Sequence, residues 1–317
     1  MITTKTVLVL GAGASAPYGF PTGANLADHC ITAIEPEDRT TLEAAGVESK
    51  EVDRFGSEVR GAQAPSIDAF LELRPEFLDV GKLVLASIFL RAEYRSLSQD
   101  KFNLSKGDHW YRIAKAKMKS SFEEFGQNKL KIITFNYDRS LEDYLCRTLC
   151  STYGKSSDEC AIQLAQIEPL HVYGSLGPLP WQRNAESVPY GVARITRNMI
   201  LKASQKIQVM HEESEDVVKR NFEKAKEWLQ WADRILFLGF GFHEDNVKRL
   251  ALGKVLQGSK EVIATCKKLD APIRQRVEFC TLAAGPHPSG SYPSSITFPD
   301  PQADCYTLLT DHVDLSS

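Results

Sequence analysis

The stretch TVLVLGAGAS, residues 6–15, decides the fold class of this chain, because an unbroken aliphatic run leads directly into a glycine-rich turn. Such runs are typical of strands that are buried on both faces of a parallel sheet. Glycines at positions 11 and 13 let the backbone approach a phosphate closely and point amide groups at it. The loop departs from the dehydrogenase motif Gly-x-Gly-x-x-Gly, because Ala16 stands where that motif has its third glycine. The alternative to a phosphate site is an ordinary tight turn between a strand and a helix.

Four further β-like runs follow along the 317-residue chain, over residues 131–135, 169–173, 235–238 and 261–265. Between them, apolar residues recur at helical spacing over 141–149 and 218–232. Strands that alternate with helices in this way predict an α/β fold built on a Rossmann-like, doubly wound parallel sheet.

Two long segments interrupt this alternation, and we predict them to be inserts within a single domain that spans residues 1–317. Residues 31–128 contain no convincing strand and several helical patterns, notably 67–72 and 80–95, so we expect an inserted helical module. Residues 178–213 form a second predicted insert. The predicted core then comprises residues 1–30, 129–177 and 214–282. We expect segment 283–317 to be irregular, because five prolines lie between residues 285 and 301.

The composition is typical of a soluble globular protein, with 43% apolar residues and a mean hydropathy of -0.26. The formal net charge is -3, and the basic residues are scattered, so we expect no direct nucleic-acid binding. No run approaches the length of a membrane span, and the apolar run at the N-terminus is too short for a secretory signal. Seven dispersed cysteines favour reduced thiols and a cytoplasmic location.

Polar side chains accompany the second and third predicted strands. Asn136 comes directly after residues 131–135, and its amide can both donate and accept hydrogen bonds. His171 lies in the next predicted strand, so both side chains can reach the carboxyl edge of a parallel sheet, where ligands bind. Imidazole titrates near neutrality, which makes His171 a candidate general base, with a packed core histidine as the alternative. Asp138 stands at the start of a helical pattern, where it can cap the helix, line the site or do both.

The fourth predicted strand ends in a second glycine-rich segment, LGFGF at residues 238–242. Gly239 and Gly241 again permit close approach of the backbone to a ligand. For Phe240 and Phe242, packing in the core is the alternative to a ligand contact.

Taken in order, the Gly-Ala-Gly loop, the Phe-Asn-Tyr-Asp loop at 135–138 and the His-Val-Tyr-Gly loop at 171–174 resemble the reactive loops of the sirtuin-like, NAD-consuming family. The flanks of the second glycine-rich segment resemble the bacterial, non-deacetylating branch of that family in particular. The resemblance implies that Asn136 and His171 are catalytic, with His171 as the general base. It also implies that NAD is contacted by Gly11, Ala12, Gly13, Ser15, Phe20, Pro21, Thr22, Asp138, Gly239, Gly241, Phe242 and Cys266.

The activity implied by this resemblance is hydrolysis of NAD, as substrate, to nicotinamide and ADP-ribose. Bacterial relatives use it in anti-phage defence by NAD depletion, which implies a homo-oligomer or a defence-system protein as partner. Deacylating sirtuins bind zinc through two Cys-x-x-Cys pairs, whereas this chain has only Cys146-x-x-x-Cys150, so we expect no zinc or other metal. It also has Pro21-Thr22-Gly23 where deacylases have Pro-Asp-Phe-Arg. An NAD-dependent protein deacylase and a non-catalytic NAD or ADP-ribose sensor remain alternatives.

Overall fold

The computed structural model describes residues 1–32, 36–64, 66–103, 109–209, 215–267, 269–282 and 294–315. Its five-stranded sheet is parallel throughout and has the order β3-β2-β1-β4-β5. The strands are β1 (Thr6–Leu10), β2 (Leu130–Thr134), β3 (Leu170–His171), β4 (Arg234–Leu238) and β5 (Glu261–Ala264). The predicted α/β class and parallel sheet are therefore confirmed. Because successive strands add on one side of β1 and then on the other, the topological switch point lies between β1 and β4.

The apolar runs form the strands for the expected reason: every residue of β1 and β4 is buried, because helices cover both faces of the sheet. Four of the five predicted strands lie within about one residue of the observed bounds. The prediction of 169–173 for the third strand is too long. After His171 the chain turns, with the Gly174 amide donating to the His171 carbonyl over 3.3 Å and Gly174 at a positive φ of 72°.

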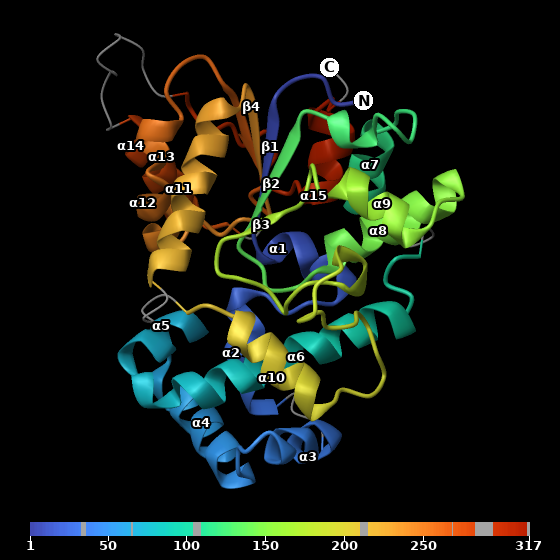
Figure 1. Cartoon of the computed structure of the whole chain (residues 1–317). Coiled ribbons are helices and arrows are strands. Elements are labelled where there is room, and N and C mark those ends of the chain that lie inside the picture. The colour runs from blue at the N-terminus through green and yellow to red at the C-terminus, as the bar shows by residue number, and fades with distance from the viewer. Residues whose placement is uncertain are drawn as a thin grey trace.

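Helices lie against both faces of the sheet (Figure 1). One face carries α11 (Glu215–Trp231), α12 (Glu244–Leu250) and α13 (Leu252–Val255). The other face carries α7 (Trp110–Lys117), α8 (Ser140–Tyr153) and α9 (Ser157–Leu164). The apolar positions predicted in α11 are buried, at Val218, Phe222, Ala225 and Leu229, so this helix packs by one apolar stripe.

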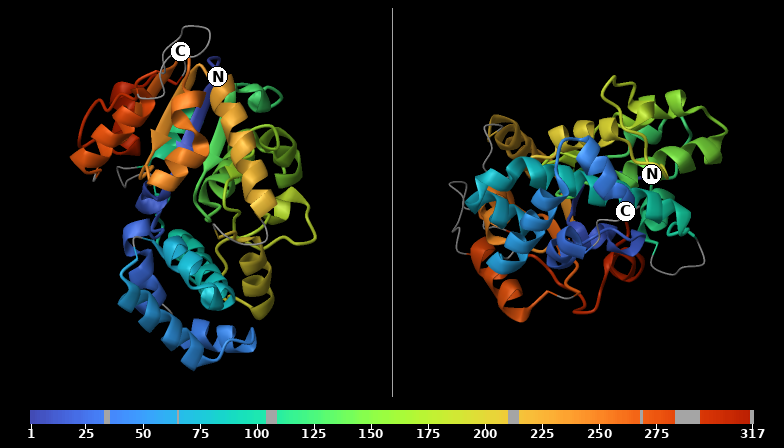
Figure 2. Two further views of the ribbon diagram at one scale, coloured as in Figure 1. Left: turned by 90° about the vertical axis from the view of Figure 1, so that its left-hand side faces the viewer. Right: turned by 90° about the horizontal axis from the view of Figure 1, so that it is seen from below.

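The described chain between β1 and β2 is helical. A four-residue helix, α1 (Ala12–Ser15), follows β1 directly. Before α7 come α2 (Gly23–Thr32), α3 (Pro36–Ala44), α4 (Ser49–Ala62), α5 (Ile67–Leu73) and α6 (Leu78–Ser98). Figures 1 and 2 show α2–α6 beyond the carboxyl ends of the strands, together with α10 (Arg197–Lys206), which packs on α6 and α3. We call α2–α6 and α10 the helical layer; it faces the edge of the sheet at which β1, β2 and β4 end.

The C-terminal part of the chain is irregular only in places. Of the proline-rich stretch 285–301, residues 285–293 lie outside the described residues, and 294–301 contribute one isolated bridge, Thr297 to Ile263. After β5 and α14 (Ala271–Leu282), the chain ends in α15 (Cys305–Thr307) and a π-helical turn, Leu308–His312, both packed near α7.

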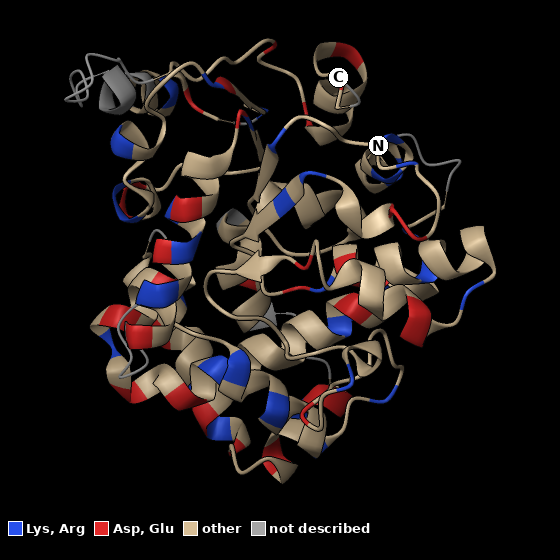
Figure 3. Cartoon of the chain, turned by 45° about the horizontal axis from the view of Figure 1, so that its top comes forward, with Lys and Arg blue, Asp and Glu red and all other residues tan. Residues whose placement is uncertain are grey.

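Charge shows no strong bias in the view of Figure 3. Lys and Arg are intermingled with Asp and Glu along the helices of the view in Figure 3. None of the helices in the described ranges combines the length and the apolar character that a membrane span requires.

Candidate active site

Asn136 and His171 lie side by side at the carboxyl edge of the sheet. β2 and β3 are neighbours, with Thr134 in register with His171, so the residues that follow them meet. The Nδ1 atom of His171 lies 2.8 Å from the main-chain oxygen of Asn136. Because a carbonyl oxygen can only accept, Nδ1 carries a proton and donates it, which fixes the plane of the ring.

The side-chain amide of Asn136 is held in one orientation. Its Nδ2 group donates to the carbonyl oxygen of Gly11 and to the hydroxyl of Ser15, each over 3.0 Å. Since the Gly11 carbonyl needs a donor, the nitrogen must face it and the oxygen Oδ1 must face away. Within the described part of the chain no hydrogen bond to Oδ1 is found. Asn136 lines a small cavity of about 10 Å³, room for about one water molecule.

Asp138 holds Ser15, the partner of the Asn136 amide, in place. Its carboxylate accepts hydrogen bonds from the amide and the hydroxyl of Ser140 and from the hydroxyl of Ser15. Burial raises the pKa of Asp138, and these hydrogen bonds oppose the rise. Ser15 thus accepts from Asn136 and donates to Asp138, so it positions the amide. Asp138 also accepts from the Ser140 amide in the turn that begins α8, although the N-cap residue itself is Arg139, and its predicted contact with NAD stays a prediction.

The two glycine-rich loops pack tightly on each other at the switch point. The Gly13 amide donates to the Gly239 carbonyl over 3.0 Å, and a Cβ on Gly13 would lie 2.8 Å from the Cα of Gly239. Gly239 has a φ of 59°, and a Cβ there would lie 2.1 Å from the Ala14 amide nitrogen. Both glycines are therefore required for the close contact between the loops that follow β1 and β4. A bulky side chain at Gly13 would disturb the fold before it reached any ligand.

The other predicted contact residues occupy varied surroundings. Phe242 is 1% exposed and packs on Phe237, with ring centres 5.1 Å apart, so its side chain belongs to the core. The buried Cys266 thiol lies 3.2 Å from the carbonyl oxygen of Asp300. The Thr22 amide donates to the Asn25 side chain over 2.7 Å, just before α2 begins at Gly23. Of the remaining predicted residues, Phe20 and Pro21 are buried, Ala12 is partly exposed and Gly241 is exposed.

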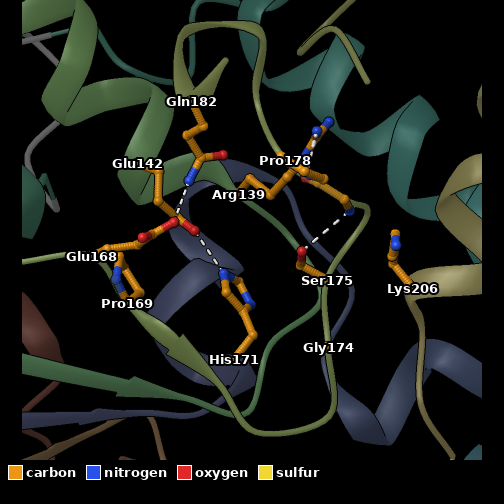
Figure 4. Close-up of a pocket in the computed structure, with 11 residues that line it drawn as sticks. Arg139, Glu142, Glu168, Pro169, His171, Gly174, Ser175, Pro178, Gln182 and Lys206 are labelled. Atoms are coloured by element: carbon orange, nitrogen blue, oxygen red, sulfur yellow. Dashed lines mark hydrogen bonds and ion pairs between the residues drawn. The ribbon is translucent and has the colours of Figure 1, made fainter. Parts of the chain in front are cut away.

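Glu142 is a site residue that the sequence interpretation misses. It lies in the first turn of α8, and its Oε1 atom is 2.6 Å from Nε2 of His171 (Figure 4). Burial lowers the pKa of His171, but the Glu142 carboxylate and the Asn136 carbonyl together outweigh it, so the pKa is raised above its ordinary value. The signal in the sequence is that Glu142 lies four residues after Asp138, in the first turn of the helix that follows the Asn136 loop.

A pocket of about 290 Å³ opens next to this pair. Glu142 and Pro169 line both the pocket and the small cavity at Asn136, so they separate the two. The pocket is lined by polar and small residues from α8, from the segment around β3 and from the end of α10: Arg139, Glu142, Glu168, Pro169, His171, Gly174, Ser175, Gly177, Pro178, Gln182 and Lys206. Figure 4 shows Gln182 directed at Glu168 and His171 directed at Glu142 across the pocket.

Arg139 fixes the wall of this pocket. The guanidinium forms a bidentate ion pair with Glu93 of α6, with separations of 3.0 and 2.6 Å. It also donates to the carbonyl oxygens of Gly177 and Val188, over 3.0 and 2.7 Å. Burial raises the pKa of Glu93, and the Arg139 charge opposes the rise. The pair therefore joins the helical layer to the loop that borders the pocket.

We expect Glu142→Gln to lower the pKa of His171, because glutamine keeps the burial and removes the negative charge. An NMR titration of the ring should give a midpoint above about 6.5 in the wild type and below it in the variant. A folded-state pKa that is raised stabilises the fold below the unfolded value, and this stabilisation is lost as the pH rises through the folded value. The stability difference between the two proteins should therefore shrink as the pH rises above about 6.5 and through the raised pKa of His171. An unchanged midpoint in the variant would show that Glu142 does not control the ring.

Over the described ranges, no group of three or more His, Cys, Asp and Glu side chains is arranged to hold a metal ion. Comparison of the chain with models of known protein families and with curated protein sequences gives no match.

Proposed function

We propose that this chain binds NAD and hydrolyses it to nicotinamide and ADP-ribose. The observation that carries the proposal is the contact between Asn136 and His171 at the carboxyl edge of the sheet, beside the Gly11 loop. Ligands of doubly wound sheets bind at this edge, next to the switch point. The order of the three loops in the sequence supports the same assignment through its resemblance to the sirtuin-like family.

The chemistry requires little more than correct positioning. The bond from ribose C1′ to the cationic nicotinamide ring is already weak, so the protein needs to hold the ribose and direct water at C1′. As that bond breaks, its electron pair goes to nicotinamide, and the attacking water gives up a proton. The Oδ1 atom of Asn136, to which none of the described residues donates, is the acceptor that orients the ribose hydroxyl or the water. The pair of His171 and Glu142 takes the proton as a unit, since Nε2 already faces the carboxylate.

The site must open for NAD to enter. The cavity at Asn136 is about 10 Å³ and the pocket at His171 about 290 Å³, whereas ligand pockets are commonly about 300–1,000 Å³. The helical layer touches the Asn136 loop through the Tyr137 hydroxyl, which donates to Asp68 of α5 over 3.0 Å. We propose that this layer moves relative to the sheet when NAD binds, which gives a trigger or partner a way to control the enzyme.

The same observations favour one alternative, a non-catalytic NAD or ADP-ribose sensor. Both ring nitrogens of His171 are engaged, and the cavity at Asn136, about 10 Å³, is too small for NAD. A protein that changes its assembly when this cavity opens would use the same residues. An NAD-dependent deacylase is the other alternative, with an acylated lysine as second substrate.

The test is to incubate the purified chain with NAD and to quantify nicotinamide and ADP-ribose by chromatography, with and without an acetylated peptide. We expect equal amounts of both products without peptide. Release that depends on the peptide would identify a deacylase. Binding of NAD by calorimetry without any nicotinamide release would contradict hydrolysis and support the sensor. A role in anti-phage defence by NAD depletion further predicts that phage infection lowers cellular NAD only in cells that carry the active chain.

A further inference from the structure

Three cysteine thiols gather at one end of the hairpin formed by α8 and α9, away from the site described above. Cys150 lies in the last turn of α8, Cys160 lies in α9, and their sulfur atoms are 3.3 Å apart. Cys146, one turn earlier in α8, is in hydrogen-bond contact with Cys150. Cys146 and Cys160 are buried, whereas Cys150 is partly exposed. A reagent from solvent therefore reaches Cys150 first.

The hairpin holds these sulfurs in place. Gly154 ends α8 with a left-handed φ of 63°, and its amide donates to the Cys150 carbonyl. Ser156 and Glu159 form a reciprocal capping box at the start of α9. The short connection is thus fixed at both ends, and the approach of the two thiols follows from ordered backbone.

We propose that Cys150 and Cys160 are a redox modification site, at which a two-electron oxidant such as hydrogen peroxide closes an intramolecular disulfide. The Cys150 sulfur attacks one peroxide oxygen, the O–O bond breaks, and the departing hydroxide takes a proton and leaves as water. The Cys160 sulfur then attacks the Cys150 sulfenic acid, the S–S bond forms, and a second water leaves with the thiol proton. Two thiols are oxidised and one peroxide is reduced to two waters.

The geometry selects Cys160 as the partner of Cys150. A disulfide needs Cβ atoms about 3.5–4.5 Å apart, whereas residues four apart on one helix keep theirs about 5–6 Å apart. Cys146 and Cys150 share α8 and cannot meet that requirement while the helix is intact. Cys160 approaches from the neighbouring helix, and its sulfur has about 1.3 Å to travel to reach the bond length of about 2.05 Å.

A disulfide between Cys150 and Cys160 would join α8 and α9 covalently, and these helices lead to the two members of the pair of His171 and Glu142. Glu142 lies in the first turn of α8, and the chain leads from α9 through Glu168 to His171. Formation of this disulfide depends only on the positions of the two thiols and not on NAD hydrolysis.

Trypsin separates the three cysteines, which makes the test direct. Cleavage after Arg139, Arg147, Lys155 and Arg183 gives peptides 140–147, 148–155 and 156–183, with one cysteine each. The native chain is treated with hydrogen peroxide, its remaining thiols are alkylated under denaturing conditions, and the digest is analysed by mass spectrometry. We expect a cross-linked species of peptides 148–155 and 156–183 that disappears on treatment with dithiothreitol.

Two matched variants control the assignment. Cys146→Ser should keep the cross-link, because the pair itself is untouched. Cys150→Ser, at the partly exposed position, should abolish it and leave Cys160 free for alkylation. A sulfinic acid at Cys150 without a cross-link would overturn the proposal. So would a dominant link between peptides 140–147 and 148–155.

Discussion

Replacing Asn136 or His171 with alanine is expected to remove most NAD cleavage while the protein stays folded. Loss of a general base typically costs about 10²–10⁴-fold in rate, and we expect His171→Ala to fall in this range. Asn136→Ala removes the proposed acceptor Oδ1 and also the hydrogen bonds to Gly11 and Ser15, so its loss of activity should be at least as large. The measurement is nicotinamide release per folded molecule, with the folded fraction taken from circular dichroism.

Asn128 provides a matched control, because it lies just before β2 while Asn136 lies just after it. Asn128 is 4% exposed, and its side chain bonds the main chain at Ile2, Met118 and Phe125. Asn128→Ala should therefore lower the melting temperature yet keep full turnover per folded molecule. If Asn136→Ala behaves in the same way as Asn128→Ala, then Asn136 is structural. A His171→Ala protein that melts early but keeps full turnover would show that the histidine only packs.

Glu142→Gln tests whether His171 takes the proton alone or together with Glu142. If the pair takes the proton, the rate of NAD cleavage in the wild type should rise with pH through the raised pKa of His171. The variant should keep part of the activity, with the midpoint of its pH profile moved to lower pH because burial is no longer opposed. A profile that does not move would mean that Glu142 takes no part in proton transfer.

The sheet could be predicted because its strands coincide with short, nearly uninterrupted aliphatic runs in the sequence. Such runs are typical of strands in a parallel sheet that helices cover on both faces. β3 was the exception, since its length is set by the turn at Gly174 and not by the apolarity of residues 169–173. The packing of α10 on α6 could not be predicted, because it joins segments far apart in the chain and leaves no local pattern.

The site was accessible to sequence reasoning only in part. Asn136 and His171 could be placed together because each follows or ends a strand, and neighbouring parallel strands end at one edge. Glu142 was missed because a carboxylate in the first helical turn has an ordinary explanation in the helix dipole. The role of Gly13 was also beyond the sequence, since glycine suits a phosphate loop and close backbone packing equally well. The contact with Gly239 shows that close backbone packing requires glycine here, and phosphate binding by this loop stays a prediction.

Arg139→Ala is expected to cause a large loss of stability, about 3–5 kcal/mol in the free energy of unfolding, measured by urea denaturation. The pair is fully enclosed, with side-chain exposures of 2% for Arg139 and 0% for Glu93. Removing the guanidinium leaves a buried carboxylate unpaired and takes the donors from the Gly177 and Val188 carbonyls. Arg147, which pairs with Asp143 at 44% exposure on the outer side of α8, is the matched control. Arg147→Ala should cost only about 0–1 kcal/mol.

The pH dependence distinguishes an unpaired charge from lost packing. In the Arg139→Ala protein burial acts on Glu93 unopposed, so its folded-state pKa should rise further above the unfolded value of about 4.3. A raised folded pKa favours the fold at low pH, and that advantage is lost as the pH rises through it. The destabilisation should therefore be larger at about pH 8 than at about pH 5, and Glu93→Leu in the same protein should recover part of it. A loss that is independent of pH, and that Glu93→Leu does not reduce, would mean that Arg139 acts by filling space and binding carbonyls, with the ion pair contributing nothing measurable.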